Sequence, residues 1–123
     1  MIQKYLFQTW TEEKNCWWLV RDFYKNQLQI ELPVYSVDLL EVNKRVSMFA
    51  KSLKKDWLRL PEPEINCVVA MGRKQEIIHV GIYVAKDKVL HLIEGFSGKI
   101  EKLQQLEKTY KTIRFYQYAS PSL

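Results

Sequence analysis

The segment Asn15-Cys16-Trp17-Trp18-Leu19-Val20-Arg21-Asp22-Phe23-Tyr24 decides how the first part of this chain folds. Its apolar residues follow the i, i+3, i+4, i+7 spacing of one helix face: Cys16, Leu19, Val20, Phe23 and Tyr24. Asn15 directly precedes them and is a favourable N-cap residue. The spacing predicts a helix with Cys16 in its first turn, where the helix dipole and free backbone N–H groups favour a thiolate.

A second helix is expected after a loop at Pro33. Ser36 would cap it, and its apolar stripe would be Leu39, Val42, Val46, Phe49, Leu53 and Trp57. The sequence Leu60-Pro61-Glu62-Pro63 would end this helical region, because proline does not suit a helix interior.

The apolar period then changes from 3.6 to 2, which predicts strands. Residues 78–84 alternate, with Ile78, Val80, Ile82 and Val84 on one face and His79, Gly81 and Tyr83 on the other. Further strands are expected at 65–71, 88–93 and 112–116, with a partly helical segment at 100–110. Cys67 is expected to be a small hydrophobic residue of the core. Helices first and antiparallel strands afterwards indicate an α+β domain.

The composition limits the possible functions. A chain of 123 residues is expected to form one domain over 1–123, with 117–123 as a frayed tail. The net charge of +5 permits an acidic partner, but the basic cluster at 51–59 is typical of a solvated helix face. We therefore expect no nucleic-acid partner. No apolar stretch approaches the roughly 18 residues of a membrane span, so no integral membrane segment is expected.

The N-terminal sequence MIQKYLFQTW lacks the apolar stretch and the cleavage site of a secretory signal. We expect synthesis in the cytoplasm without a signal peptide, and no disulfide between Cys16 and Cys67. Nothing in the sequence suggests a metal site or a cofactor.

The only two histidines, His79 and His91, lie on neighbouring predicted strands. A hairpin with a two-residue loop would place His91 opposite Ile82 and turn the imidazoles to opposite faces. A three-residue loop at 85–87 would place His91 opposite Gly81 and make the histidines diagonal neighbours on one face, with Cβ atoms roughly 7–8 Å apart. In that register Gly81 would leave room between the rings for an approaching group and would form part of the wall of the cleft.

These groups together suggest nucleophilic catalysis, if the Cys16 helix packs against the face that bears His79. His79 would take the proton of the Cys16 thiol and return it to a leaving amine. His91 would accept the other N–H of His79 and fix its tautomer. The backbone N–H of Cys16 would help to hold the oxyanion.

Residues 15–24 resemble the nucleophile segment of the NlpC-type cysteine peptidases, especially the lone phage-tail-associated branch in which a Cys-Trp pair opens the helix. The continuation Ile30-Glu31-Leu32-Pro33-Val34-Tyr35 is similar to that branch. The sequence from His79 to Val84, followed by Val89-Leu90-His91, is similar to the histidine segment of the family. The ending Ile113-Arg114-Phe115-Tyr116-Gln117-Tyr118 fits more loosely.

The resemblance implies a papain-like fold with N-terminal helices packed on an antiparallel sheet. It implies a triad of Cys16 as nucleophile, His79 as base and His91 as orienting residue, with Tyr5 at the oxyanion site. The implied reaction is hydrolysis of peptidoglycan stem peptides, commonly beside the γ-linked D-glutamate. Phage members sit at the tail tip or take part in tail assembly, so the virion tail and other tail proteins are the implied location and partners.

Two positions depart from the family pattern. Asn15 stands where the residue before the nucleophile is usually Asp, and Trp18 stands where a small residue, usually Gly, is expected. Trp18 would crowd the catalytic cleft or form an unusual wall to it. The glycine-rich approach to the cysteine is also missing from 8–14.

Two other functions therefore stay open. One is a structural or tail-assembly module that kept the fold and lost efficient turnover. The other is an acyltransferase or deamidase that uses a thioester at Cys16.

Overall fold

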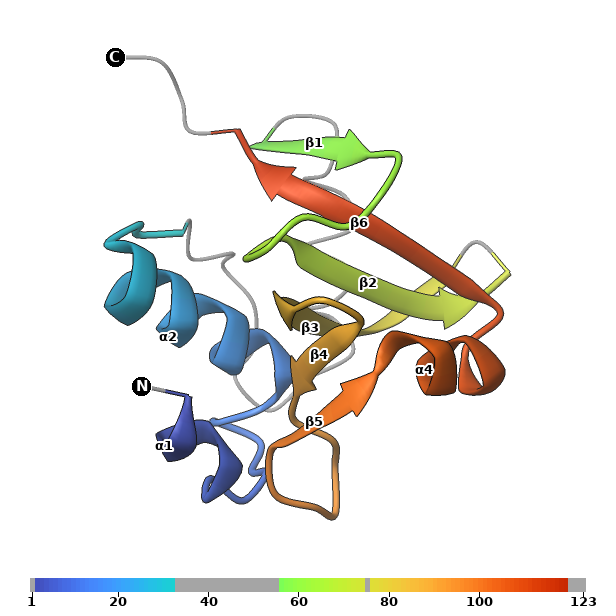
Figure 1. The fold of residues 1–123 in the computed structure, drawn as a ribbon. Helices are drawn as coiled ribbons and strands as arrows, with labels where there is room; N and C mark the ends of the chain where they lie inside the picture. The colour runs from blue at the N-terminus through green and yellow to red at the C-terminus, as the bar shows by residue number, and fades with distance from the viewer. Residues whose placement is uncertain (1, 33–55, 75, 120–123) are drawn as a thin grey trace.

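Six antiparallel strands form one sheet in the order β1-β6-β2-β3-β4-β5 (Figure 1). The computed structural model describes residues 2–32, 56–74 and 76–119. Along the chain these contain α1 (Gln3–Leu6), α2 (Cys16–Leu28), β1 (Trp57–Leu60), β2 (Val68–Arg73), β3 (Glu76–Ala85), β4 (Lys88–His91), β5 (Lys99–Lys102), α4 (Leu103–Thr109) and β6 (Thr112–Tyr118). The predicted α+β class, with helices before an antiparallel sheet, is confirmed.

The helix α2 begins at Cys16, as the apolar spacing predicts. Oδ1 of Asn15 accepts a hydrogen bond from the Trp18 backbone N–H at 3.0 Å, and Nδ2 of Asn15 donates to the Glu12 carbonyl at 2.9 Å. Both ends of the buried amide are therefore satisfied. The helix ends at Gln29, whose left-handed backbone (φ 54°) closes the last turn.

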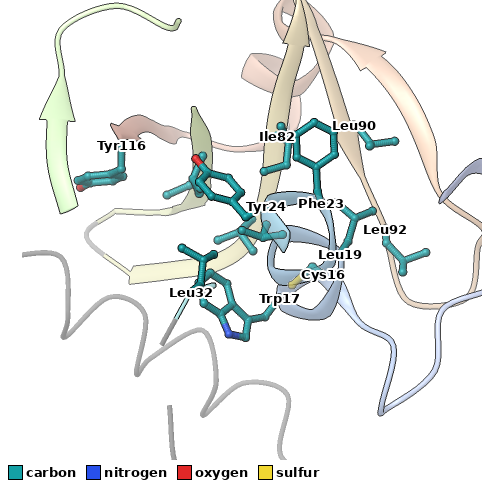
Figure 2. Close-up of a cluster of buried hydrophobic side chains, with 14 of the residues drawn as sticks. Cys16, Trp17, Leu19, Phe23, Tyr24, Leu32, Ile82, Leu90, Leu92 and Tyr116 are labelled. Carbon is teal, nitrogen blue, oxygen red and sulfur yellow. The ribbon is translucent and has the colours of Figure 1, made fainter. Parts of the chain in front are cut away.

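Both faces of the sheet are buried. On one face, α2 packs its apolar side against Val68, Ala70, Val80, Ile82 and Leu90, and Figure 2 shows part of this cluster. The opposite face buries Val69, Met71, Tyr83 and Val89 beneath Leu106 of α4. Neighbouring residues of β2 alternate between the two clusters, as the period of two in a strand requires.

Two features of the sequence prediction are corrected. Trp57 does not belong to a helix but begins β1, where it pairs with Tyr118 of β6 and their ring centroids lie 5.1 Å apart. Because this pairing extends β6 to Tyr118, the expected frayed tail at 117–123 is wrong for its first two residues. The partly helical segment expected at 100–110 is confirmed, since it contains α4 after the end of β5. The rest of the second predicted helix, at 36–55, lies outside the described residues.

Within the described residues, no helix is long and apolar enough to cross a membrane.

Candidate active site

Cys16 lies at the point where α2 meets the edge of β3. Its side chain is 3 % exposed and belongs to the apolar cluster under α2 (Figure 2). The sulfur accepts hydrogen bonds from the backbone of Val80 and from the backbone N–H groups of Trp17 and Cys16 itself. Val80 directly follows His79, so the first turn of α2 brings the thiol to the backbone of the histidine segment.

The pairing of the strands explains why Val80 can bind the sulfur. Backbone hydrogen-bonding directions alternate along an antiparallel strand, and the Tyr83 N–H points to the Cys67 carbonyl on the β2 side. The Val80 N–H therefore points to the β4 side. The ladder between β3 and β4 ends at the pair Gly81 and His91, so this N–H lies beyond the last β4 pair and is available to the sulfur.

This arrangement corrects the expected packing of the helix. Val80 and Ile82 lie under α2, so His79, which alternates with them, leaves the sheet on the opposite face. There its ring stacks on Tyr110, with centroids 6.0 Å apart and planes at 17°. The body of α2 therefore does not cover His79. The first turn of α2 is connected to the histidine segment through the backbone of Val80.

The pKa of the Cys16 thiol also differs from expectation. Burial raises it to about 11, although the backbone hydrogen bonds from Val80, Trp17 and Cys16 favour the thiolate. The helix N-terminus therefore does not outweigh desolvation, and the resting group is a neutral thiol. A base must take its proton for the sulfur to become a strong nucleophile.

The register of the β3–β4 hairpin brings the two histidines together. Gly81 pairs with His91, which confirms the register that places both imidazoles on one face. The predicted three-residue loop is replaced by a shorter turn, because Ala85 pairs with Lys88 and a β-bulge between Tyr83 and Ala85 adds the extra residue. The same-face register that the proposed histidine pair requires is therefore present, but it comes from a β-bulge and not from a three-residue loop.

The paired histidines continue into a chain of hydrogen bonds. His79 Nε2 lies 2.9 Å from His91 Nδ1, and His91 Nε2 lies 2.9 Å from Oε1 of Glu101 on β5. Lys99 Nζ contacts the same oxygen at 3.1 Å. Because His79 Nε2 is engaged by His91, Nδ1 is the nitrogen of His79 that is left to serve a substrate or the thiol.

Burial strongly affects the charge of each side chain in this hydrogen-bonded series. Desolvation, and then the charge of His91, lowers the pKa of His79 to about 3, so its imidazole is a neutral proton acceptor at pH 7. Burial also lowers the pKa of His91, although Glu101 opposes this shift. Partial burial alone would raise the pKa of Glu101, but Lys99 and His91 lower it. Glu101 is thus a carboxylate beside two neutral rings.

Other predicted site residues have different surroundings. The Tyr5 hydroxyl donates to Asp22 Oδ2 at 2.8 Å, so its single proton is not directed at an oxyanion. Gly81 is buried beneath the histidine pair. A Cβ on it would lie 2.8 Å from the Leu90 carbonyl oxygen and 3.0 Å from the His91 Cβ. Gly81 is therefore a spacer within the hairpin rather than a wall of a cleft.

Trp18 lies on the outer side of α2. Its ring meets Tyr5 edge to face at 6.1 Å, and Lys14 Nζ lies 5.4 Å from its centroid. It lines a cavity of about 200 Å³ with Arg21, Asp22, Lys25, Glu31 and Leu32. Among the described lining residues there is neither Cys16 nor a histidine, so this cavity is separate from the thiol.

Two neighbours of the histidines are missing from the sequence analysis: Glu101 and Tyr110. The Lys99-Ile100-Glu101 alternation is a signal of a short strand, whereas the sequence prediction for 100–110 is a partly helical segment. Tyr110 follows α4 and reaches His79 only through the tertiary fold. Burial, and then the charges of Cys16 and Glu101, raises the pKa of its hydroxyl, so Tyr110 belongs to the same electrostatic environment.

A thiol at the start of a helix, packed on a sheet whose neighbouring strands carry two paired imidazoles, is the arrangement of a papain-like cysteine peptidase. A model of the NlpC/P60 family matches residues 3–118, and the chain belongs to this family. No individual curated protein matches the chain. The match is to the whole family, so the phage-tail branch stays a prediction.

The family implies a hydrolase of the cysteine-peptidase type that acts on peptidoglycan. In the described part of the chain, no group of three or more His, Cys, Asp or Glu side chains is arranged to hold a metal ion.

Proposed function

We propose that this chain is a cysteine endopeptidase that hydrolyses peptidoglycan stem peptides, with Cys16 as nucleophile, His79 as base and His91 as orienting residue. The observation that carries the proposal is the 2.9 Å contact between His79 Nε2 and His91 Nδ1. It leaves Nδ1 of His79 as the candidate base, and the backbone of Val80, the residue after His79, favours the thiolate form of Cys16. Family membership supports the substrate class.

The reaction uses these groups in order. As the Cys16 sulfur attacks the peptide carbonyl, its proton moves to Nδ1 of His79, because the resting thiol and imidazole are both neutral. The backbone N–H groups of Cys16 and Trp17 at the start of α2 stabilise the oxyanion. His79 then protonates the leaving amine, and water hydrolyses the thioester that remains on Cys16.

A second function, an assembly module with weak or no turnover, has one observation in its favour. Cys16 is 3 % exposed and its thiol pKa is raised to about 11, so substrate must displace atoms to reach the sulfur. A setting in a phage tail is carried by the sequence resemblance of residues 15–24 and 30–35. An acyltransferase would use the same thioester but release it to an amine or alcohol instead of water.

The test is incubation of the full chain with defined muropeptides, followed by mass spectrometry and detection of new amines. We expect a hydrolysed stem peptide from the wild type and none from Cys16→Ala. Cys67→Ala is the matched control, because Cys67 is equally buried but lies in the cluster on the other face, and it should retain activity. A folded wild type that yields no product from any muropeptide would remove the hydrolase proposal. A product joined to an added amine would indicate the acyltransferase.

A further inference from the structure

Glu101 is the end of the histidine hydrogen-bond chain, and it has no part in the triad proposed above. Its Oε1 lies 2.9 Å from His91 Nε2 and 3.1 Å from Lys99 Nζ. The His91 side chain is completely buried, whereas Glu101 is about one-third exposed. The carboxylate therefore connects an enclosed imidazole to the protein surface.

The chemistry of the three groups fixes where each proton lies. A carboxylate can only accept, so His91 Nε2 must carry the hydrogen of this contact. A neutral His91 then has a lone pair on Nδ1, and the 2.9 Å contact requires a hydrogen on His79 Nε2. His79 is left with a lone pair on Nδ1, the nitrogen that the reaction needs as base.

We infer that Glu101 is a positioning residue that sets the tautomers of both histidines, so that His79 presents its basic Nδ1 to Cys16. The inference rests on the proposed function, and it adds a fourth residue that touches neither substrate nor thiol. With a hydrogen-bond donor in place of Glu101, His91 would carry its hydrogen on Nδ1. His79 Nε2 would then have to accept, and His79 Nδ1 would hold a hydrogen and could not act as base.

Lys99 strengthens this arrangement. An ammonium group can only donate, and Lys99 Nζ contacts the same oxygen that faces His91. The atom between Lys99 and His91 must therefore be an acceptor. His79 on β3 contacts the other nitrogen of His91, and the charge of Glu101 contributes to the raised pKa of the Tyr110 hydroxyl after α4. Among the described residues, neither forms a hydrogen bond with the oxygen shared by Lys99 and His91.

The test is two-bond ¹H–¹⁵N correlation spectroscopy of the ¹⁵N-labelled full chain at pH 7, which distinguishes imidazole tautomers. With only two histidines in the sequence, each ring can be assigned by one His→Gln variant. We expect both rings to carry hydrogen on Nε2 in the wild type. A wild-type spectrum in which either ring carries hydrogen on Nδ1 would overturn the inference, and this result needs no assignment and hence no folded variant.

Variants of Glu101 separate positioning from general stability. In Glu101→Ala the His91 tautomer should become mixed, and kcat for muropeptides should fall about tenfold or more while KM stays constant. In Glu101→Gln, Lys99 should hold the amide oxygen toward His91 and preserve both the tautomer and most of kcat. In the double variant Glu101→Gln/Lys99→Met, both the single His91 tautomer and the high kcat should be lost. An unchanged tautomer in Glu101→Ala would contradict the inference.

Glu107→Gln is the matched control. It removes the same charge from an exposed position on α4, and both spectrum and kcat should be unchanged. The two proposals can fail separately. If the wild type shows the expected tautomers but cleaves no muropeptide, only the peptidase function is removed. If it cleaves muropeptides but His91 has the other tautomer, only the role of Glu101 is removed.

Discussion

His79 Nε2 and His91 Nδ1 lie 2.9 Å apart, so two residues separated by twelve positions form one hydrogen-bonded unit. The unit exists because the β3–β4 register places His91 opposite Gly81. Among the described residues, no hydrogen bond engages the other nitrogen of His79, and the next residue, Val80, is the one whose backbone favours the Cys16 thiolate. Four predictions follow from this relationship and its surroundings.

The first concerns the reactivity of the two cysteines. Both are buried, and burial raises the pKa of each thiol to about 11. Cys16 is linked to the backbone of Val80, the residue after His79. If His79 is its base, as proposed, iodoacetamide should label Cys16 about tenfold or more faster than Cys67 at pH 7. Mass spectrometry of tryptic peptides over time gives both rates. In His79→Gln the two rates should become similar, and equal labelling in the wild type would contradict the assignment of His79 as base.

The second concerns stability in acid. Burial, reinforced by His91, lowers the folded-state pKa of His79 from 6.5 to about 3. Between these values the unfolded chain binds a proton that the folded chain does not, so stability is lost as the pH falls through this window. The loss from this residue is at most about 1.4 kcal/mol per pH unit. Urea unfolding at several pH values gives the free energy of unfolding as a function of pH. This free energy should fall less steeply with decreasing pH in His79→Gln than in the wild type, and an equal dependence on pH in both proteins would refute the prediction.

The third concerns the space above Gly81. A methyl group there would meet the Leu90 carbonyl oxygen at 2.8 Å and the His91 Cβ at 3.0 Å. We expect Gly81→Ala to lower the free energy of unfolding by about 1–3 kcal/mol and to displace the imidazole signals of both histidines. Denaturation and NMR measure these effects. Gly95→Ala is the comparison: no atom lies within 4 Å of its added methyl, although its φ of 88° also costs stability. In Gly95→Ala the imidazole signals of His79 and His91 should not move.

The fourth concerns Asn15, which stands where the family usually has Asp. Asn15→Asp would keep the acceptor for Trp18 but lose the donor to the Glu12 carbonyl in a fully buried position. We expect about 1–3 kcal/mol of destabilisation and slower alkylation of Cys16, because a nearby carboxylate opposes the thiolate. Asn15→Ser, which keeps a neutral cap, should alkylate at nearly the wild-type rate. Faster alkylation in Asn15→Asp would show that the family residue suits this chain better.

Local patterns predicted much of this structure. The 3.6-residue spacing and the Asn15 cap gave the start of α2 at Cys16, because helix amphipathicity and capping depend on nearby residues. The alternation at 78–84 predicted the faces of β3, except that Ile78 lies at a β-bulge and is 40 % exposed. Patterns failed where a partner distant in the sequence decides the structure. Trp57 is in a strand because β6 pairs with it.

The sequence by itself determined the candidate groups, a thiol at a helix start and two histidines on neighbouring strands. Only the tertiary structure decided how they are arranged and what surrounds them. The β3–β4 register places both imidazoles on one face, the first turn of α2 brings Cys16 to the Val80 backbone, and β5 brings Glu101 to His91. Burial then raises the thiol pKa that the helix terminus alone would lower. Desolvation depends on how many atoms surround a group, and no local pattern of residues contains that information.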